Sequence, residues 1–308
     1  MKCSVKIGKL VLKNPVMAAS GTFGYGEEFG SLAVLKKLGA IVSKTITLNP
    51  RPGNIPPRTC ETYAGMLNSI GLENPGAEVF LKEKLPVLKR IGVPLIVSIA
   101  SEGDAGEFAV LARRLDAIPA VEAIELNISC PNVVHKKGGT KYPLIAQDAR
   151  ATYAVVKTVR KATRKTVITK LSPNVTDITE IALAAEQAGS DAVSLVNTFY
   201  GMSIDIAGRR PKLGNRIGGV SGPAIKPLAL KMVCDAAQKL GIPVIGMGGI
   251  MNAGDALEFL IAGATAVAVG TANFVTPGIT GEIVDGIQRY LRAHKIGSIN
   301  SLIGSIRS

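Results

Sequence analysis

The chain has 308 residues, of which 47% are hydrophobic and 19% are charged. This composition is typical of a protein with a large buried core and excludes a disordered or fibrous chain. The 36 Lys and Arg residues outnumber the 23 Asp and Glu residues, which gives a formal charge of +13. No long basic run with interleaved aromatic residues is present, so we expect this charge on solvated outer helices and not on a nucleic-acid surface.

Short apolar segments alternate with longer segments of helical periodicity along the chain. This alternation predicts parallel strands covered by helices. Eight strands are expected, at residues 15–20, 40–47, 94–100, 123–129, 166–172, 192–197, 243–249 and 266–272. No linker rich in Pro, Gly and Ser divides the units, which favours an α/β fold of the (β/α)8 TIM-barrel type, with residues 1–308 forming a single barrel domain.

Three intervals are longer than a simple strand and helix unit needs: 48–78, 131–147 and 198–223. Long loops in compact domains are usually functional, and we expect 131–147 to be an active-site loop. Residues 256–275 are the most apolar stretch, but polar residues and glycines interrupt them. They predict a buried helix and then a buried strand, not a membrane span.

The four cysteines, at positions 3, 60, 130 and 234, form no CxxC pair. The two histidines, His135 and His294, are far apart and are expected to face solvent. The sequence therefore contains no pattern for a zinc site or an iron–sulfur cluster, and no metal is expected. Widely spaced cysteines and the absence of a secretion signal near residue 1 favour a cytoplasmic protein.

The carboxyl ends of the expected strands are polar, and in a barrel this is where the active site lies. The strand ends contribute Ser20, Lys44, Ser98, Asn127, Cys130, Lys170, Asn197 and Thr198. Lys44 and Lys170 stand in otherwise apolar strands, where an ammonium group needs an anionic or polar partner. A ligand contact is the favoured interpretation, and a lysine that reaches water or forms a Schiff base is the alternative.

Glycine turns follow the seventh and eighth strands, at Gly246, Gly248, Gly249 and Gly270. Bare backbone at such turns lets amide N–H groups approach a phosphate, although glycines can also simply close tight turns. Cys130 stands at the start of the 131–147 loop, flanked by Asn127, Ser129 and Asn132. Its thiol can be a nucleophile, a base or a packed apolar group, and these polar neighbours favour a chemical role.

Several motifs together resemble the dihydroorotate dehydrogenase family, specifically the catalytic subunit of its cytoplasmic, NAD-linked class 1B, from Val5 to Phe274. The motifs are ASGTFGYG (19–26), SKT (43–45), NSIGLENPG (68–76), NISCPNV (127–133), TKLSPNVTDI (169–178), VNT (196–198), GGVSGPAIKP (218–227), GMGGI (246–250) and AVAVGTANF (266–274).

The resemblance implies an FMN at the carboxyl-terminal face of the strands, with Lys170 near flavin N1 and the C2 carbonyl, where negative charge develops on reduction. The residues implied around the flavin are Ser20, Lys44, Thr45, Ser98, Asn127, Lys170, Val196, Gly222, Gly248, Gly249, Gly270 and Thr271. The family commonly has Asn where Ser98 stands, so we expect the shorter serine side chain to reach less far toward the flavin or to lose that hydrogen bond.

The implied reaction is the oxidation of (S)-dihydroorotate to orotate in pyrimidine (UMP) biosynthesis. Cys130 would remove the C5 proton while hydride passes from C6 to flavin N5. An ordinary thiol has a pKa near about 8.5, so activity is expected to rise with pH. The residues implied around the substrate are Lys44, Asn68, Ser69, Ile70, Gly71, Leu72, Asn127, Asn132, Asn197 and Thr198.

The resemblance also implies a partner subunit that carries FAD and a 2Fe–2S cluster and passes electrons to NAD. The expected assembly is a heterotetramer of two catalytic and two electron-transfer chains around a homodimer of this chain.

The membrane-bound class has a serine base and meets quinone, so neither a membrane nor quinone is expected here. Two other functions are alternatives for this chain: a flavoenzyme that resembles dihydropyrimidine dehydrogenase, or one that resembles tRNA-dihydrouridine synthase. Residues 295–308 have no recognised counterpart.

Overall fold

A computed structural model describes residues 1–26, 32–101, 105–129, 136–137, 140–141 and 145–307. Eight parallel strands close into a barrel, in the order β3-β4-β7-β8-β11-β12-β17-β18. Their bounds are β3 Val16–Ala18, β4 Ala40–Val42, β7 Leu95–Ile99, β8 Ala123–Asn127, β11 Thr166–Lys170, β12 Ala192–Leu195, β17 Val244–Met247 and β18 Ala266–Val269. Each lies inside a predicted strand, so the prediction of a (β/α)8 barrel is confirmed.

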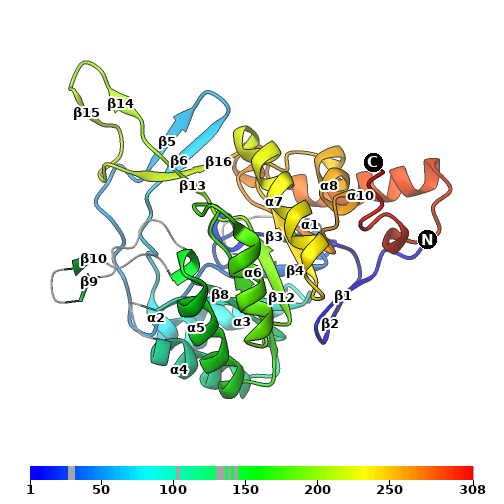
Figure 1. Ribbon diagram of the computed structural model, residues 1–308, viewed down its shortest axis with the longest axis horizontal. Helices are drawn as coiled ribbons and strands as arrows, with labels where there is room; N and C mark the ends of the chain where they lie inside the picture. Colours follow the sequence, from blue (N-terminus) through cyan, green and yellow to red (C-terminus); the bar gives the residue numbers. More distant parts are fainter. Residues whose placement is uncertain (27–31, 102–104, 130–135, 138–139, 142–144, 308) are drawn as a thin grey trace.

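Helices follow the barrel strands and form an outer layer around them (Figure 1). Their bounds are α1 Leu32–Leu35, α2 Gly76–Val79, the π-helix η2 Phe80–Lys84, α3 Leu85–Arg90, α4 Ala105–Asp116, α5 Ala149–Ala162, α6 Ile178–Gln187, α7 Lys226–Lys239, α8 Ala253–Ile261, α9 Ala272–Val275 and α10 Ile279–Ala293. Short 3-10 helices are η1 Ser20–Thr22, η3 Ile145–Gln147, η4 Pro223–Ile225 and η5 Ile299–Ser301. Basic side chains on these helices, such as Arg113 and Lys157, are exposed as expected, while Arg160 is half-buried.

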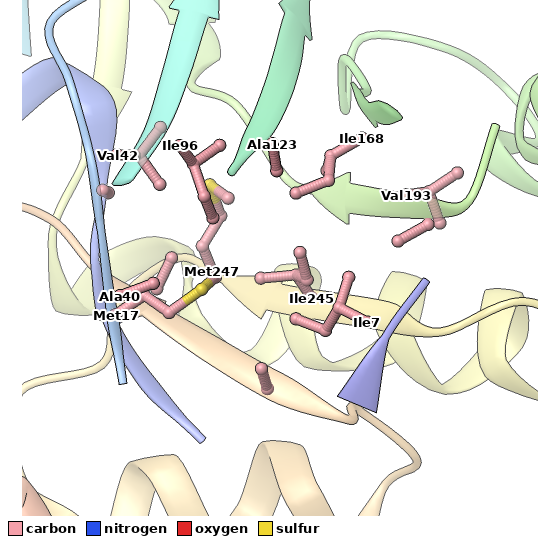
Figure 2. Close-up of a cluster of buried hydrophobic side chains, with 14 of the residues drawn as sticks. Ile7, Met17, Ala40, Val42, Ile96, Ala123, Ile168, Val193, Ile245 and Met247 are labelled. Atoms are coloured by element: carbon pink, nitrogen blue, oxygen red, sulfur yellow. The ribbon is translucent and has the colours of Figure 1, made fainter. Parts of the chain in front are cut away.

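The barrel interior is filled by apolar side chains from successive strands, including Ile96, Ile168, Val193 and Ile245 (Figure 2). An N-terminal hairpin of β1 (Val5–Ile7) and β2 (Leu10–Leu12) covers the amino ends of the strands. Ile7 belongs to the same buried cluster, and Lys9 N donates to Thr166 Oγ1 at the start of β11 over 3.1 Å. The amino end of the barrel is therefore closed, and ligands must enter from the carboxyl end.

The C-terminal segment, which had no recognised counterpart in the family, is described as far as residue 307 and packs near the N-terminus. Ile299 is fully buried, and its N–H donates to the carbonyl of Lys2 over 2.9 Å. Lys2 N in turn donates to Gly297 O over 2.9 Å. This segment therefore covers the outside of the closed end, far from the strand ends that carry the predicted site.

The predicted long loops at 48–78 and 198–223 contain strands that pair with each other. They form a four-stranded antiparallel sheet in the order β13-β16-β6-β5, beside the small hairpin β14-β15. The bounds are β5 Thr59–Thr62, β6 Gly65–Asn68, β13 Phe199–Gly201, β14 Ile204–Asp205, β15 Arg210–Pro211 and β16 Gly218–Ser221. Sheet and hairpin project from one side of the barrel (Figure 1, upper left), and we call them the insertion sheet.

The third interval is described only in part, as the strand pair β9 (Lys136–Lys137) and β10 (Thr140–Lys141) and as η3. The apolar stretch 256–275 contains the end of α8 and then β18, as predicted. Among the described residues, no helix is long and apolar enough to span a bilayer.

Candidate functional site

A cavity of about 220 Å³ opens at the carboxyl ends of the barrel strands. Its walls come from the ends of β3, β8, β11, β12, β17 and β18 and from the insertion sheet. Because the insertion sheet stands over the mouth, Asn68 and Leu72 line the same cavity as Lys170, which ends β11. The site is therefore a deep space with a barrel floor and a wall built by the two insertions.

Two ammonium groups give this cavity a positive charge. Lys170 is only 5% exposed, and its Nζ donates to Ser20 Oγ over 3.2 Å. Lys44 is half-buried, and its ammonium group has no hydrogen-bond or ion-pair partner among the described residues. Glu73 also lines the cavity, but its carboxylate pairs with Arg58 Nη1 over 2.7 Å. The charge balance therefore favours an anionic ligand.

The glycine turn after β17 forms another wall. Gly248 and Gly249 have φ angles of 126° and 75°. A Cβ at Gly249 would lie 2.7 Å from Cβ of Lys226, and one at Gly248 would lie 2.7 Å from Cβ of Ala229. Only glycine fits this turn without strain, and its bare backbone lets a ligand approach closely.

Lys226 lies directly behind this turn but adds little to the charge of the cavity. Its Nζ pairs with Asp255 over 2.7 Å and with Glu258 over 2.8 Å. Hydrogen bonds to Asp255 and then to Glu258 raise the pKa of Lys226 above its ordinary value. This ammonium group is therefore neutralised locally, and the cavity's free positive charge comes from Lys44 and Lys170.

Side-chain amides form the polar part of the wall. Asn127 Nδ2 donates to Thr45 Oγ1 over 3.0 Å, and Asn197 Nδ2 donates to Ser129 Oγ over 2.9 Å. Asn68 Nδ2 donates to Gly219 O over 3.3 Å, which joins the two insertions. Asn127 and Asn197 each keep a further donor or acceptor position, so the wall suits a ligand that alternates N–H and carbonyl groups.

The segment from Asn68 to Leu72 is held in place by Asn74, which is buried. Asn74 Oδ1 accepts from the N–H groups of Thr47 and Gly76 over 3.1 and 2.9 Å. Asn74 Nδ2 donates to Leu72 O over 2.7 Å. Leu72 itself has a φ of 57°, which is unfavourable for a branched side chain. The hydrogen bonds of Asn74 therefore fix a loop conformation that would not persist alone.

A sequence profile of the family described as dihydroorotate dehydrogenase matches residues 2–291. The chain belongs to the dihydroorotate dehydrogenase family. It is 53% identical to a protein of Thermoanaerobacter pseudethanolicus over 307 residues, which cover 100% of this chain and 99% of that protein. It is 54% identical to one of Trichlorobacter lovleyi over 303 residues, 98% of each chain. Both relatives are named "Dihydroorotate dehydrogenase B (NAD(+)), catalytic subunit".

A third relative with the same name, from Geobacter sulfurreducens, is 53% identical over 303 residues, which cover 98% of this chain and 97% of that protein. The expected membership of the dihydroorotate dehydrogenase family is thus confirmed over nearly the whole chain. Enzymes of this family are in general flavin-dependent.

Most residues predicted from the dihydroorotate dehydrogenase motifs meet at this cavity. For the flavin, these are Ser20, Lys44, Thr45, Asn127, Lys170, Val196, Gly222, Gly248, Gly249, Gly270 and Thr271. For the substrate, they are Lys44, Asn68, Ile70, Gly71, Leu72, Asn127, Asn197 and Thr198. The predicted base Cys130 and the predicted contact Asn132 lie outside the described residues.

Two predicted residues do not line the cavity. Ser98 is fully buried below it, and its hydroxyl bonds Glu125 and Thr45. Ser69 is also fully buried, and its hydroxyl accepts from Asn54 and Asn215 over 3.0 and 2.9 Å. Ser98 can therefore reach a ligand only through Thr45, while Ser69 connects the two insertions.

Other lining residues were not predicted. They include Thr22, Thr59, Ser221, Ile225, Met247, Ile250, Met251 and Phe274. Thr22 and Ser221 lie in quoted motifs, and Ser221 accepts a hydrogen bond from Thr271 Oγ1 over 2.9 Å. The apolar members carry no chemical signature in the sequence, and only the fold shows that they face the cavity.

We expect Asn74→Ala to loosen the loop that carries Asn68 and Leu72. The substitution removes buried hydrogen bonds to Thr47, Gly76 and Leu72 and should lower the free energy of unfolding by about 2–3 kcal/mol. Chemical denaturation measures this loss, and limited proteolysis should show faster cleavage within 48–74. Asn49→Ala is the control, because Asn49 is exposed in the same loop. Equal stability of the two variants would contradict the role given to Asn74.

Proposed function

We propose that this protein oxidises dihydroorotate to orotate with FMN bound in the cavity at the barrel mouth. The observation that carries the proposal is the cavity itself, where two ammonium groups, several amides and a glycine turn lie together. Family membership and the names of relatives at 53–54% identity support the same reaction. The finer assignments below are parts of this proposal.

The residues present fit a flavin with a phosphate tail. Gly248 and Gly249 line the cavity and pack against Ala229 and Lys226 so closely that any Cβ would clash, which leaves bare backbone at the cavity wall for a phosphate to approach. Thr271 and Gly270 lie at the next turn around the barrel, and Lys170 with Ser20 lies on the floor. We assign the turns to the phosphate and Lys170 to the part of the ring that gains negative charge. FMN, when bound, supplies the site that accepts hydride from substrate C6.

The substrate is proposed to lie between the insertion sheet and the flavin. Lys44 presents an ammonium group that no described carboxylate neutralises, so it suits the substrate carboxylate. Asn68, Asn127 and Asn197 match the alternating N–H and carbonyl groups of a dihydropyrimidine ring. These contacts orient the ring and exclude water from the reacting carbons.

Cys130 is proposed as the base that takes the C5 proton. The support lies in its chain position, because it directly follows Ser129, which is buried and whose carbonyl accepts from Nδ2 of the cavity-lining Asn197 over 3.1 Å. A thiolate adjacent to this wall can accept a proton from a carbon next to a carbonyl group.

Electrons are proposed to leave through a partner subunit that carries FAD and a 2Fe–2S cluster, with NAD as final acceptor, in the cytoplasm. The relatives' names support this, since they specify NAD(+) and a catalytic subunit. We propose a heterotetramer of two chains of each kind, with a dimer of this chain at its centre.

The insertion sheet is the proposed contact between the two copies of this chain. It carries exposed apolar side chains at Tyr63, Tyr200, Met202, Ile204, Ile206 and Ile217. Leaving such a group in water is unfavourable, and contiguous apolar surface commonly marks an interface. A two-fold dimer uses the same patch on both subunits, so one sheet is sufficient.

The first test is spectroscopic. The purified protein should show flavin absorbance, and anaerobic dihydroorotate should bleach it. Cys130→Ala should keep flavin and orotate binding but slow the bleaching by about 10²–10⁴-fold, because the proton acceptor is lost. Cys234→Ala on α7 is the control and should bleach at the wild-type rate. A colourless protein or an unbleached flavin contradicts the proposed function, and a normal rate in Cys130→Ala removes only the base.

A second test addresses Lys44. Lys44→Met keeps the length of the side chain but removes its charge, so orotate should bind about 10–100-fold more weakly in a calorimetric titration. Uracil, which lacks the carboxylate, should bind the wild type and the variant equally. Lys161→Met, at an exposed position on α5, is the control. An equal loss for both ligands would show that Lys44 does not meet the carboxylate.

The dimer is tested by light scattering on the chain alone, which should have twice the monomer mass. Ile206→Asp places a charge on a side chain that is 87% exposed in the monomer and should shift the mass to that of one chain. Ile306→Asp changes an exposed isoleucine in the C-terminal segment and should leave the dimer intact. A monomeric wild type would contradict this arrangement.

A further inference from the structure

A carboxylate lies inside the barrel, below the cavity floor. Glu125 on β8 is 2% exposed. Its Oε1 accepts from Ser98 Oγ on β7 over 3.0 Å, and its Oε2 accepts from Ser194 Oγ on β12 over 3.1 Å. No cationic side chain of the described residues forms an ion pair with it. A buried carboxylate is costly unless hydrogen bonds satisfy it, so its position calls for a reason.

One of its two serines begins a continuous series of side-chain hydrogen bonds that reaches the cavity wall. Ser98 Oγ lies 2.9 Å from Thr45 Oγ1, which accepts from Asn127 Nδ2 over 3.0 Å. Asn127 Oδ1 accepts from Ser129 Oγ over 3.4 Å, and Ser129 Oγ accepts from Asn197 Nδ2 over 2.9 Å. We call this series, from Glu125 to Asn197, the relay.

The carboxylate determines the direction of the bonds in the relay from Glu125 as far as Ser129. A carboxylate only accepts, so the single hydroxyl hydrogen of Ser98 points to Glu125. Ser98 must then accept from Thr45, whose only hydroxyl hydrogen is used in that bond. Thr45 therefore offers a lone pair to the cavity side, and only the NH2 group of Asn127 can bond it.

The same logic fixes the amide of Asn127. If Asn127 were turned by 180°, its oxygen would face Thr45 Oγ1 with no hydrogen between them. With NH2 toward Thr45, the carbonyl of Asn127 takes the hydrogen of Ser129, and Ser129 then accepts from the NH2 group of Asn197. The cavity amide of Asn127 is thus held in one orientation by a group that does not touch the cavity, since Glu125 is not among its lining residues. Asn197 is oriented by the backbone as well, because its Nδ2 also donates to the carbonyl of Ser129 and its Oδ1 accepts from the N–H of Thr198.

We propose that Glu125 is a positioning residue for the pyrimidine ligand. Acting through Ser98 and Thr45, it fixes which edge of Asn127 is the donor and which is the acceptor, so that Asn127 also takes the hydroxyl hydrogen of Ser129. A ring with alternating N–H and carbonyl groups binds only if the amides face it with the complementary pattern. The inference rests on the proposed function, because it takes orotate as the ligand that these amides meet.

Two serines on the same carboxylate provide a matched pair of variants. Both are fully buried, and each donates to one oxygen of Glu125. Ser98→Ala cuts the relay, whereas Ser194→Ala removes an equivalent hydrogen bond outside it. Titrating orotate into the FMN-loaded protein by calorimetry should give about tenfold weaker binding for Ser98→Ala and a change of less than about twofold for Ser194→Ala. Both should lower the melting temperature by similar amounts.

The carboxylate and the next link are tested in the same assay. Glu125→Gln keeps an oxygen that can accept from Ser98, with its NH2 toward Ser194, so orotate binding should be retained. Glu125→Leu has no acceptor and should match the loss in Ser98→Ala. Thr45→Val should also match it, Thr45→Ser should restore binding, and Ser98→Ala combined with Thr45→Val should be no weaker than either alone.

The outcomes separate the two proposals. If the wild type fails to bind orotate, the proposed function is wrong, and the positioning role of Glu125 is overturned as well. If the wild type binds orotate and the two serine variants bind it equally, the relay alone is overturned. Additive losses in the double variant, or full binding in Thr45→Val, overturn it as well, whether or not Glu125→Leu folds.

Discussion

Closure of eight parallel strands into one barrel is the constraint on which the rest of this structure depends. A closed sheet has no free edge, and all eight carboxyl ends must meet around one opening. Residues as distant in sequence as Ser20 and Lys170 are therefore brought within hydrogen-bond distance, at 3.2 Å. The N-terminal hairpin closes the other end, so the opening at the carboxyl ends is the one that holds the cavity.

The interior of this barrel has two chemically different layers. Near the amino ends it is apolar, with residues such as Ile96, Ile168 and Val193 packed together. One layer below the mouth, Glu125, Ser98 and Ser194 replace them. Polar groups at this depth weaken the core unless all are satisfied, and here each carboxyl oxygen has a serine partner. The mouth thus rests on a polar layer that is both rigid and oriented.

The barrel could be predicted from the sequence because its strands are continuous runs of Val, Ile and Ala. Lys44, Lys170 and the glycine turns were found for the same reason, since the end of a buried strand is a recognisable place. Ser98 could not be placed so well, because the height of a residue in a barrel depends on register. Its partner across the sheet is Glu125 and not Asn127, which puts it one layer deeper than predicted.

The insertion sheet was missed for another physical reason. Its strands, such as Thr59–Thr62 and Gly218–Ser221, are short, polar or rich in glycine and show no alternation. They are strands because they pair, and the pairing of Leu67 with Val220 joins segments 153 residues apart. Such pairing leaves no local mark in a single sequence. The cavity wall beside Asn68 was therefore visible only in the fold.

This pairing also bears on how the chain can change over evolutionary time. Strands β6 and β16 lie side by side, and each comes from a different insertion. Deleting either insertion alone would expose the edge of the other, with unpaired N–H and carbonyl groups that invite aggregation. The two segments, separated by four barrel strands in the chain, are therefore inherited as one unit: shortening, lengthening or exchanging one succeeds only when the other changes with it.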